Sequence, residues 1–230
     1  SVADFLGVLV QAGYNIFISG GTGSGKTTFL NAMSSFIPKE ERVITIEDNA
    51  ELQIRHIPNL VRLEARNANV DGCVPISIRD LIRTSLRMRP DRIIVGEVRG
   101  GEAVDMIQAM NTGHDGSMST GHANSAKDMM SRLEIMILQG AELPVAAIRA
   151  QIASALDIVV HLGRLRDKSR KVLEIAEVLG IQEGEIAMRT IFRFEERGEC
   201  NGKITGVWVR EDELEKKDKL ALAGIRLPDG

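Results

Sequence analysis

Residues 15–33 read NIFISGGTGSGKTTFLNAM, in which an apolar run leads into a glycine-rich loop and then into a helical pattern. The loop fits the phosphate-loop pattern GxxxxGK[ST] at every fixed position, and strand, loop and helix follow in the required order. Glycine is needed because such a loop uses backbone angles that a Cβ forbids and converges its N–H groups on an anion. The predicted loop residues are Gly20, Gly21, Thr22, Gly23, Ser24, Gly25, Lys26, Thr27 and Thr28.

Two side chains of this loop carry its expected chemistry. Lys26 is expected to reach the β and γ phosphates of a nucleotide, and Thr27 to place its hydroxyl on Mg²⁺. The alternative is a plain glycine-rich turn between a strand and a helix, which the full match in the correct context disfavours. We therefore predict a binding site for a nucleoside triphosphate.

Composition agrees with a globular protein but decides little. The 230 residues are 43% hydrophobic, 27% charged and 3% aromatic, with a formal net charge of -3. Neither the charge nor the few aromatic side chains favour binding to nucleic acid. Cys73 and Cys200 are expected to be free thiols in a reducing cytosol. No apolar stretch approaches the roughly 20 residues that span a bilayer, so we expect any membrane contact to be peripheral.

Strand-like and helix-like segments alternate along the first two thirds of the chain. Apolar runs predict strands at 15–19, 42–46, 61–64, 92–95, 117–120 and 158–162. Amphipathic patterns predict helices at 2–10, 78–86, 102–110, 126–138 and 144–155. A turn-rich segment through Asn67, Asn69, Asp71 and Gly72 predicts a surface loop. This alternation predicts an α/β fold with a doubly wound, mainly parallel sheet.

The pattern changes after residue 163, and we divide the chain there into a core over 1–163 and a β-rich extension over 164–230. The basic run from Arg164 to Lys171 is interpreted as a solvated turn, with a membrane surface or an acidic partner as the alternative contact. The expected elements beyond it are β-like runs at 172–179 and 186–194 forming a hairpin, a strand over 202–210, and a charged helix over 212–223.

The predicted strand at 92–95 ends in Gly96-Glu97. Phosphate-loop proteins usually end this strand in an aspartate that holds Mg²⁺, and here a glycine leaves Glu97 as the carboxylate. We choose Glu97 to orient or deprotonate the attacking water, although a solvated strand end is the alternative. Arg99 is expected either to neutralise charge at the phosphates or to pair with Glu97 or Glu102.

Two further strand ends carry polar residues. Glu47 and Asp48 follow the strand at 42–46, where their oxygens are expected to join Thr27 around Mg²⁺, with a polar turn as the alternative. His122 follows the strand at 117–120, where its imidazole is expected to reach the γ-phosphate and report hydrolysis. A lone histidine is more often structural, and that interpretation is given to His56 and His161.

Together these motifs resemble the type II and type IV secretion ATPases, and most closely the CpaF-like branch that powers Tad, or Flp, pilus assembly. The matching stretches are GGTGSGKTT at 20–28, VITIEDNAEL at 43–52, RMRPDRIIVGEVRGGEA at 87–103 and MNTGHDGSMSTGHANS at 110–125. Because four motifs occur in order and the likeness continues to the tail GIRLPDG, the resemblance covers essentially the whole chain.

The resemblance implies a RecA-like domain in a hexameric ring with ATP between subunits, cytoplasmic and peripheral to the inner membrane, acting on an inner-membrane platform protein without nucleic acid. It implies Glu97 as the catalytic glutamate, Lys26 and Thr27 on phosphate and Mg²⁺, and His122 near the γ-phosphate, with Glu47 and Asp48 near the metal. Family members carry an N-terminal domain whose arginines help complete the neighbouring site. We expect this domain to be absent from the chain, either because the chain is an excised motor domain or because the resemblance misleads about its start, and we expect half of an intersubunit site here.

Two other functions remain open from the sequence. A nucleic-acid-translocating RecA-like ATPase would share the fold and the triphosphate chemistry, but low aromatic content and negative charge argue against it. A scaffold that binds ATP without turnover would need no catalytic glutamate, and the presence of Lys26, Thr27 and Glu97 argues against that. Gly121 departs from the family pattern, in which a larger apolar residue is common.

Overall fold

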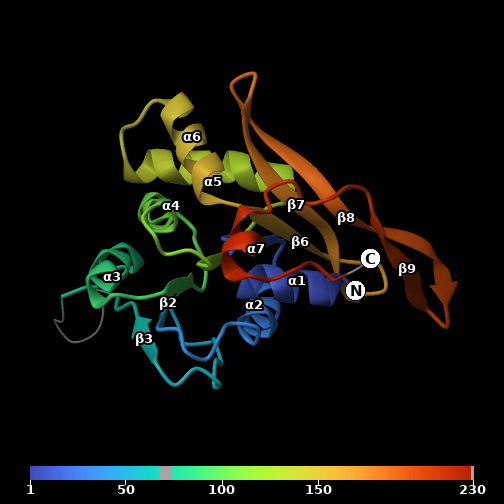
Figure 1. Cartoon of the computed structure of the whole chain (residues 1–230), viewed down its shortest axis with the longest axis horizontal. Helices are drawn as coiled ribbons and strands as arrows, with labels where there is room; N and C mark the ends of the chain where they lie inside the picture. Colours follow the sequence, from blue (N-terminus) through green and yellow to red (C-terminus); the bar gives the residue numbers. More distant parts are fainter. Residues whose placement is uncertain (68–73, 229–230) are drawn as a thin grey trace.

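The computed structural model describes residues 1–67 and 74–228, and a nine-stranded sheet forms its centre (Figure 1). The strand order is β3-β2-β4-β5-β1-β6-β7-β8-β9, in which β1 to β6 pair in parallel and β7 to β9 are added antiparallel. The strands are β1 Ile16–Gly20, β2 Val43–Glu47, β3 Leu60–Glu64, β4 Arg92–Val95, β5 Met118–Gly121, β6 Ile158–Arg164, β7 Arg170–Gln182, β8 Glu185–Cys200 and β9 Lys203–Arg210.

Helices cover both faces of the sheet, because strand side chains alternate between two apolar clusters. Ile16 and Ile18 pack on one face with α1 and α2, whereas Phe17 packs on the other with α3 to α6. The predicted doubly wound, mainly parallel α/β fold is therefore confirmed. The helices are α1 Val2–Gln11, α2 Lys26–Ser34, α3 Ile78–Ser85, the short 3-10 turn Leu86–Met88, α4 Ala103–Asn111, α5 Ala126–Gly140, α6 Val145–Ala155 and α7 Asp218–Ala223.

The parallel strands bring four sequence motifs to one edge of the sheet. Ser19 of β1 pairs with Gly121 of β5, so the phosphate loop and His122 leave the sheet at the same level. Val95 of β4 pairs with Ile46 of β2, which brings the residues that follow them level in the same way. Because parallel strands end on one side, side chains from distant parts of the chain meet there.

The C-terminal part continues the sheet rather than starting a new one. The predicted hairpin and extra strand are present, and β7 begins two residues earlier than the β-like run at 172–179. The predicted helix over 212–223 is wrong in its first half, since α7 covers only Asp218–Ala223. The reason is Glu177, whose buried carboxylate accepts the backbone N–H groups of Glu215 and Lys216 at 2.9 and 2.8 Å and holds that segment out of a helix.

Part of the predicted surface loop lies outside the described residues, including Asn69, Asp71 and Gly72, as does Cys73. An isolated antiparallel bridge between Arg66 and Ile76 flanks that segment. Among the described helices, no single one is long and apolar enough to cross a bilayer. The pair α5 and α6 reaches that length and composition together, with a bend of 119° between them.

Candidate functional site

The phosphate loop joins β1 to α2 through glycines in a conformation that side chains rarely adopt. Gly23 and Gly25 have φ values of 72° and 93°, so substitution by any L-residue would strain the loop. Gly25 also caps α2, which means that the first helical residue is Lys26. The N–H groups at this helix start are free to converge on an anion, as the sequence predicted for a phosphate cradle.

Lys26 is the centre of the loop's polar contacts. Its ammonium donates to the backbone carbonyls of Gly20 and Gly21, each at 3.0 Å, and lies 3.4 Å from Nδ1 of His122. The residue is only 8% exposed, and burial lowers the pKa of its ammonium despite the nearby charge of Glu97. An anion in the pocket would therefore meet a cation that has little water around it.

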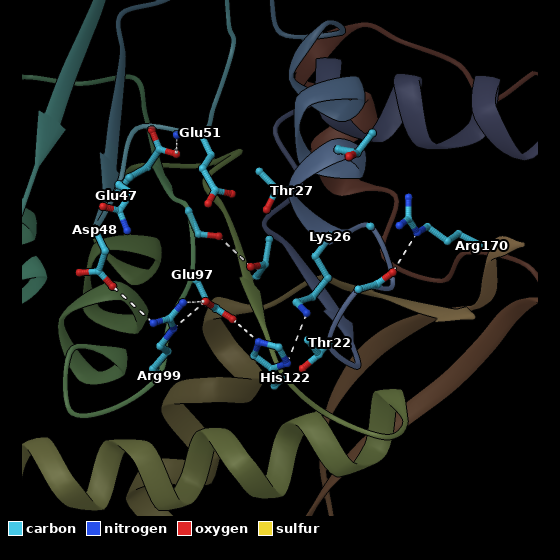
Figure 2. Close-up of a pocket in the computed structure, with 16 residues that line it drawn as sticks. Thr22, Lys26, Thr27, Glu47, Asp48, Glu51, Glu97, Arg99, His122 and Arg170 are labelled. Atoms are coloured by element: carbon cyan, nitrogen blue, oxygen red, sulfur yellow. Dashed lines mark hydrogen bonds and ion pairs between the residues drawn. The ribbon is translucent and has the colours of Figure 1, made fainter. Parts of the chain in front are cut away.

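His122 links the lysine to Glu97 (Figure 2). Its Nε2 lies 2.6 Å from Oε1 of Glu97. Since an ammonium can only donate, the contact with Lys26 requires Nδ1 to accept, and Nε2 then carries the proton that is donated to Glu97. Arg99 contacts the second oxygen of Glu97, with its Nε 2.6 Å from Oε2. Both carboxylate oxygens of the predicted catalytic glutamate are thus engaged.

Arg99 itself is held in place by its neighbours. Its guanidinium extends toward Asp48, with Nη1 at 3.9 Å from Oδ2, and its backbone N–H donates to Oε1 of Glu102 at 2.6 Å. The carboxylate contacts with Glu97 and Asp48 raise the pKa of Arg99, so it stays charged. Of the two roles expected for Arg99, pairing with Glu97 is therefore the one that this structure contains.

Glu47 explains the unusual Gly96. Glu47 is buried, and its Oε1 accepts the backbone N–H groups of Glu51 at 3.0 Å and Leu52 at 2.9 Å. A Cβ on Gly96 would lie 3.0 Å from Cγ of Glu47. The glutamate of β2 therefore fills the space into which a side chain at position 96 would project, and a carboxylate still stands at this point of the sheet edge.

These residues line one pocket of about 470 Å³ at the carboxyl ends of the parallel strands. It draws on all four motifs and on one residue of β7. The lining residues are Thr22, Gly23, Gly25, Lys26, Thr27, Thr28, Glu47, Asp48, Asn49, Glu51, Gly96, Glu97, Arg99, Thr120, His122 and Arg170. Of the predicted loop residues, Gly20, Gly21 and Ser24 are not part of this lining; Gly20 and Ser24 are buried, and Gly21 is exposed.

The donor set of the pocket fits Mg²⁺ better than a metal that needs a complete protein cage. Thr27, Glu47 and Asp48 offer hard oxygen atoms on one side of the phosphate loop. Within residues 1–67 and 74–228, no three His, Cys, Asp or Glu side chains converge on one point. Mg²⁺ usually keeps several waters and takes one or two protein ligands beside substrate phosphates, which matches this sparse set.

The two histidines interpreted as structural lie outside the pocket lining, as expected. His161 Nδ1 lies 2.8 Å from the hydroxyl of Ser19, and burial lowers the pKa of this histidine. His56 contacts the carbonyl of Ile37 at 3.3 Å. Packing explains why residue 121 is a glycine, because a Cβ there would lie 2.9 Å from the ring of Phe17.

Arg170 is a charged pocket residue that the sequence interpretation missed, because it was assigned to a solvated turn. It opens β7, and its Nε donates to the carbonyl of Gly23 at 2.9 Å. β7 returns antiparallel from the carboxyl end of β6, with Arg164 paired to Arg170, so the first residue of β7 necessarily reaches the phosphate-loop edge. The sequence contained a signal for this position, because a short polar turn after the parallel strand β6 predicts that the next strand returns antiparallel beside it.

Known proteins are similar to this chain in sequence. A protein of Mycobacterium tuberculosis (strain ATCC 25618 / H37Rv) named for conjugal transfer is 45% identical over 184 residues, which cover 80% of this chain and 51% of the relative. The type IV secretion system protein VirB11 of Brucella suis is 41% identical over 162 residues, 69% of this chain and 45% of the relative. The chain thus spans about half the length of these relatives.

Solved structures agree. The VirB11 ATPase of the Brucella suis type IV secretion system, crystallised with sulphate, superimposes with a TM-score of 0.68 at 37% identity, covering 76% of this chain and 52% of that one. The pilus retraction motor PilT with bound ADP gives 0.53 at 25% identity, over 79% and 48%. These neighbours confirm the RecA-like phosphate-loop fold. The family model for type II/IV secretion system proteins matches residues 1–207, and the chain therefore belongs to that family.

Proposed function

We propose that this chain is the motor domain of an ATP hydrolase that drives protein secretion or pilus assembly. One observation carries the proposal: Glu97 is held between His122 and Arg99 in the pocket that also contains the phosphate-loop lysine. A loop that only binds nucleotide needs the lysine. A carboxylate with both oxygens oriented beside that lysine is what attack by water requires in addition.

In the proposed reaction, water attacks the γ-phosphorus, and the bond to the leaving oxygen of ADP breaks. Glu97 orients that water and accepts its proton, and Lys26 balances the negative charge that the phosphoryl oxygens carry. Thr27, Glu47 and Asp48 would hold Mg²⁺, which would neutralise part of the phosphate charge when bound. His122 lies between Glu97 and Lys26, so a change at the phosphates reaches the catalytic carboxylate through one imidazole.

We further propose that the site is completed by a neighbouring subunit in a hexameric ring. Arg99 is two-thirds exposed although it holds two pocket carboxylates, which suits a site covered by a second chain. The motif pattern favours the CpaF-like branch of the family, with an inner-membrane platform protein as partner and a cytoplasmic location at that membrane. We keep the division into a core over 1–163 and an extension over 164–230 as part of this proposal.

Two measurements on the 230-residue chain test the function. We expect equilibrium titration to detect ATP binding, and turnover per chain to rise with protein concentration as subunits assemble. Light scattering with and without a nonhydrolysable ATP analogue reports the assembly directly. Absence of ATP binding would contradict the phosphate-loop assignment. Rapid turnover by a monomer, independent of concentration, would contradict the shared site.

A further inference from the structure

We infer that Arg170 is a nucleotide-binding residue, which contacts the α and β phosphates and supplies from β7 a positive charge opposite the catalytic glutamate. The inference rests on the proposed function, since it names a further contact of the same substrate. It begins from the side chain's position. Arg170 belongs to the C-terminal extension, yet it lines the pocket and bonds to the phosphate loop across 147 positions of sequence.

The contact with the loop fixes where the guanidinium lies. Nε donates to the carbonyl of Gly23 at 2.9 Å, and Cδ would lie 3.1 Å from a Cβ on Gly25. A side chain at position 25 would therefore crowd this arm. The stem thus packs against the loop while one of five N–H donors is used, and Arg170 forms no ion pair with a carboxylate in the described part of the chain.

Arg99, the other arginine of the pocket, differs in this respect. Its guanidinium contacts the carboxylates of Glu97 and Asp48, so its charge is already balanced within the protein. Arg170 is balanced by no such partner in the described residues. A bound polyphosphate would supply that counter-charge, and guanidinium donors match phosphate oxygens closely.

The position also selects which phosphates meet Arg170. Figure 2 shows Glu97 and Arg170 on opposite sides of Lys26. If the γ-phosphate lies at Glu97, where water attacks, the chain of phosphates runs past Lys26 toward Arg170. The phosphates nearest the nucleoside are then the ones within its reach. Arg170 should therefore support ATP and ADP binding equally and should not distinguish the two.

The test compares Arg170→Ala with Lys171→Ala, an adjacent variant that loses the same charge. Lys171 makes a matched control because its ammonium lies over the Phe194 and Trp208 rings, 5.9 Å from each centroid, and is not part of the pocket lining. We expect Arg170→Ala to weaken ATP and ADP binding by about tenfold each, as expected for one charge-assisted contact at an open site. Arg170→Lys should restore part of the loss, and Lys171→Ala should bind normally.

The melting temperature without nucleotide distinguishes a purely structural role of Arg170 from a role in nucleotide binding. We expect that temperature to be unchanged in Arg170→Ala, because the lost bond is exposed. The inference is overturned if Arg170→Ala binds ADP normally, if only ATP binding falls, or if affinity falls together with the melting temperature and lysine restores neither. No nucleotide binding by the unaltered chain would overturn the proposed function and this contact together, whereas normal binding by Arg170→Ala overturns the contact alone.

Discussion

Replacement of Glu47 tests whether this buried carboxylate holds the sheet edge as well as the metal. Glu47 is 6% exposed, and its Oε1 accepts the backbone N–H groups of Glu51 and Leu52. In Glu47→Ala both N–H groups lose this acceptor, while in Glu47→Gln a carbonyl oxygen of the same shape remains. The pair of variants therefore separates the loss of charge from the loss of the acceptor.

The contacts set the expected magnitudes. The bond to Leu52 is buried, so losing its acceptor should cost about 1–3 kcal/mol, while the bond to Glu51 is partly exposed and water can replace it. Removal of the buried Cγ methylene group adds roughly 1 kcal/mol. We expect Glu47→Ala to lower the free energy of unfolding by about 3 kcal/mol. For Glu47→Gln the expected loss is about 1 kcal/mol, because the remaining bonds lose only their ionic character.

Urea denaturation without nucleotide or Mg²⁺ measures both values, since no ligand then contributes to stability. A parallel titration of ATP with and without Mg²⁺ should show that Glu47→Gln weakens the Mg²⁺-dependent part of binding. If Glu47→Ala changed the free energy of unfolding by less than about 0.5 kcal/mol, the two backbone bonds would not hold the segment after β2 and the reasoning would fail.

Three further predictions follow from neighbouring contacts. Lys26→Ala should weaken ATP binding strongly without lowering the stability of the nucleotide-free chain. Burial lowers the pKa of Lys26, so keeping this side chain charged at neutral pH costs the folded state free energy. A clear fall in the melting temperature of Lys26→Ala would contradict this. Burial also lowers the pKa of His161, so as the pH falls the unfolded chain takes up its proton before the folded chain does. The free energy of unfolding should therefore be full above about pH 6.5 and decrease as the pH falls below that value. Urea titrations of His161→Gln should show a flatter decrease. Gly140→Ala places a Cβ 2.2 Å from the carbonyl oxygen of Gly101. This clash should lower the free energy of unfolding by about 1–3 kcal/mol and should also reduce turnover, because it displaces the loop that carries Arg99. Normal values in both assays would contradict this prediction and show that the loop adapts freely.

The sequence predicted the parallel core well because its signals are local. Apolar runs bounded by glycine and proline, and helices with caps such as Ser77 before α3, specify their own structure. The phosphate loop, Glu97 and His122 could be placed in one pocket for a simple reason: the carboxyl ends of parallel strands meet at one edge.

The features that the sequence did not predict depend on contacts between distant residues. The start of α7 was misplaced because Glu177, far away on β7, binds the backbone of Glu215 and Lys216. Arg170 was missed because its place in the pocket follows from the antiparallel return of β7 onto β6. The space that Glu47 takes beside Gly96 likewise belongs to the packed sheet, and neither residue's neighbours in sequence reveal it.

The central claim, that Glu97 serves hydrolysis in a site built to bind ATP, is tested most directly by single-turnover hydrolysis in Glu97→Gln. The glutamine keeps the shape of the side chain and can still accept from Arg99, but it cannot take the proton of water. With Mg²⁺ and protein in excess over radiolabelled ATP, we expect binding within about threefold of the unaltered chain and cleavage slower by a factor on the order of 100 or more. Cleavage at the normal rate with normal binding would contradict the assignment of Glu97.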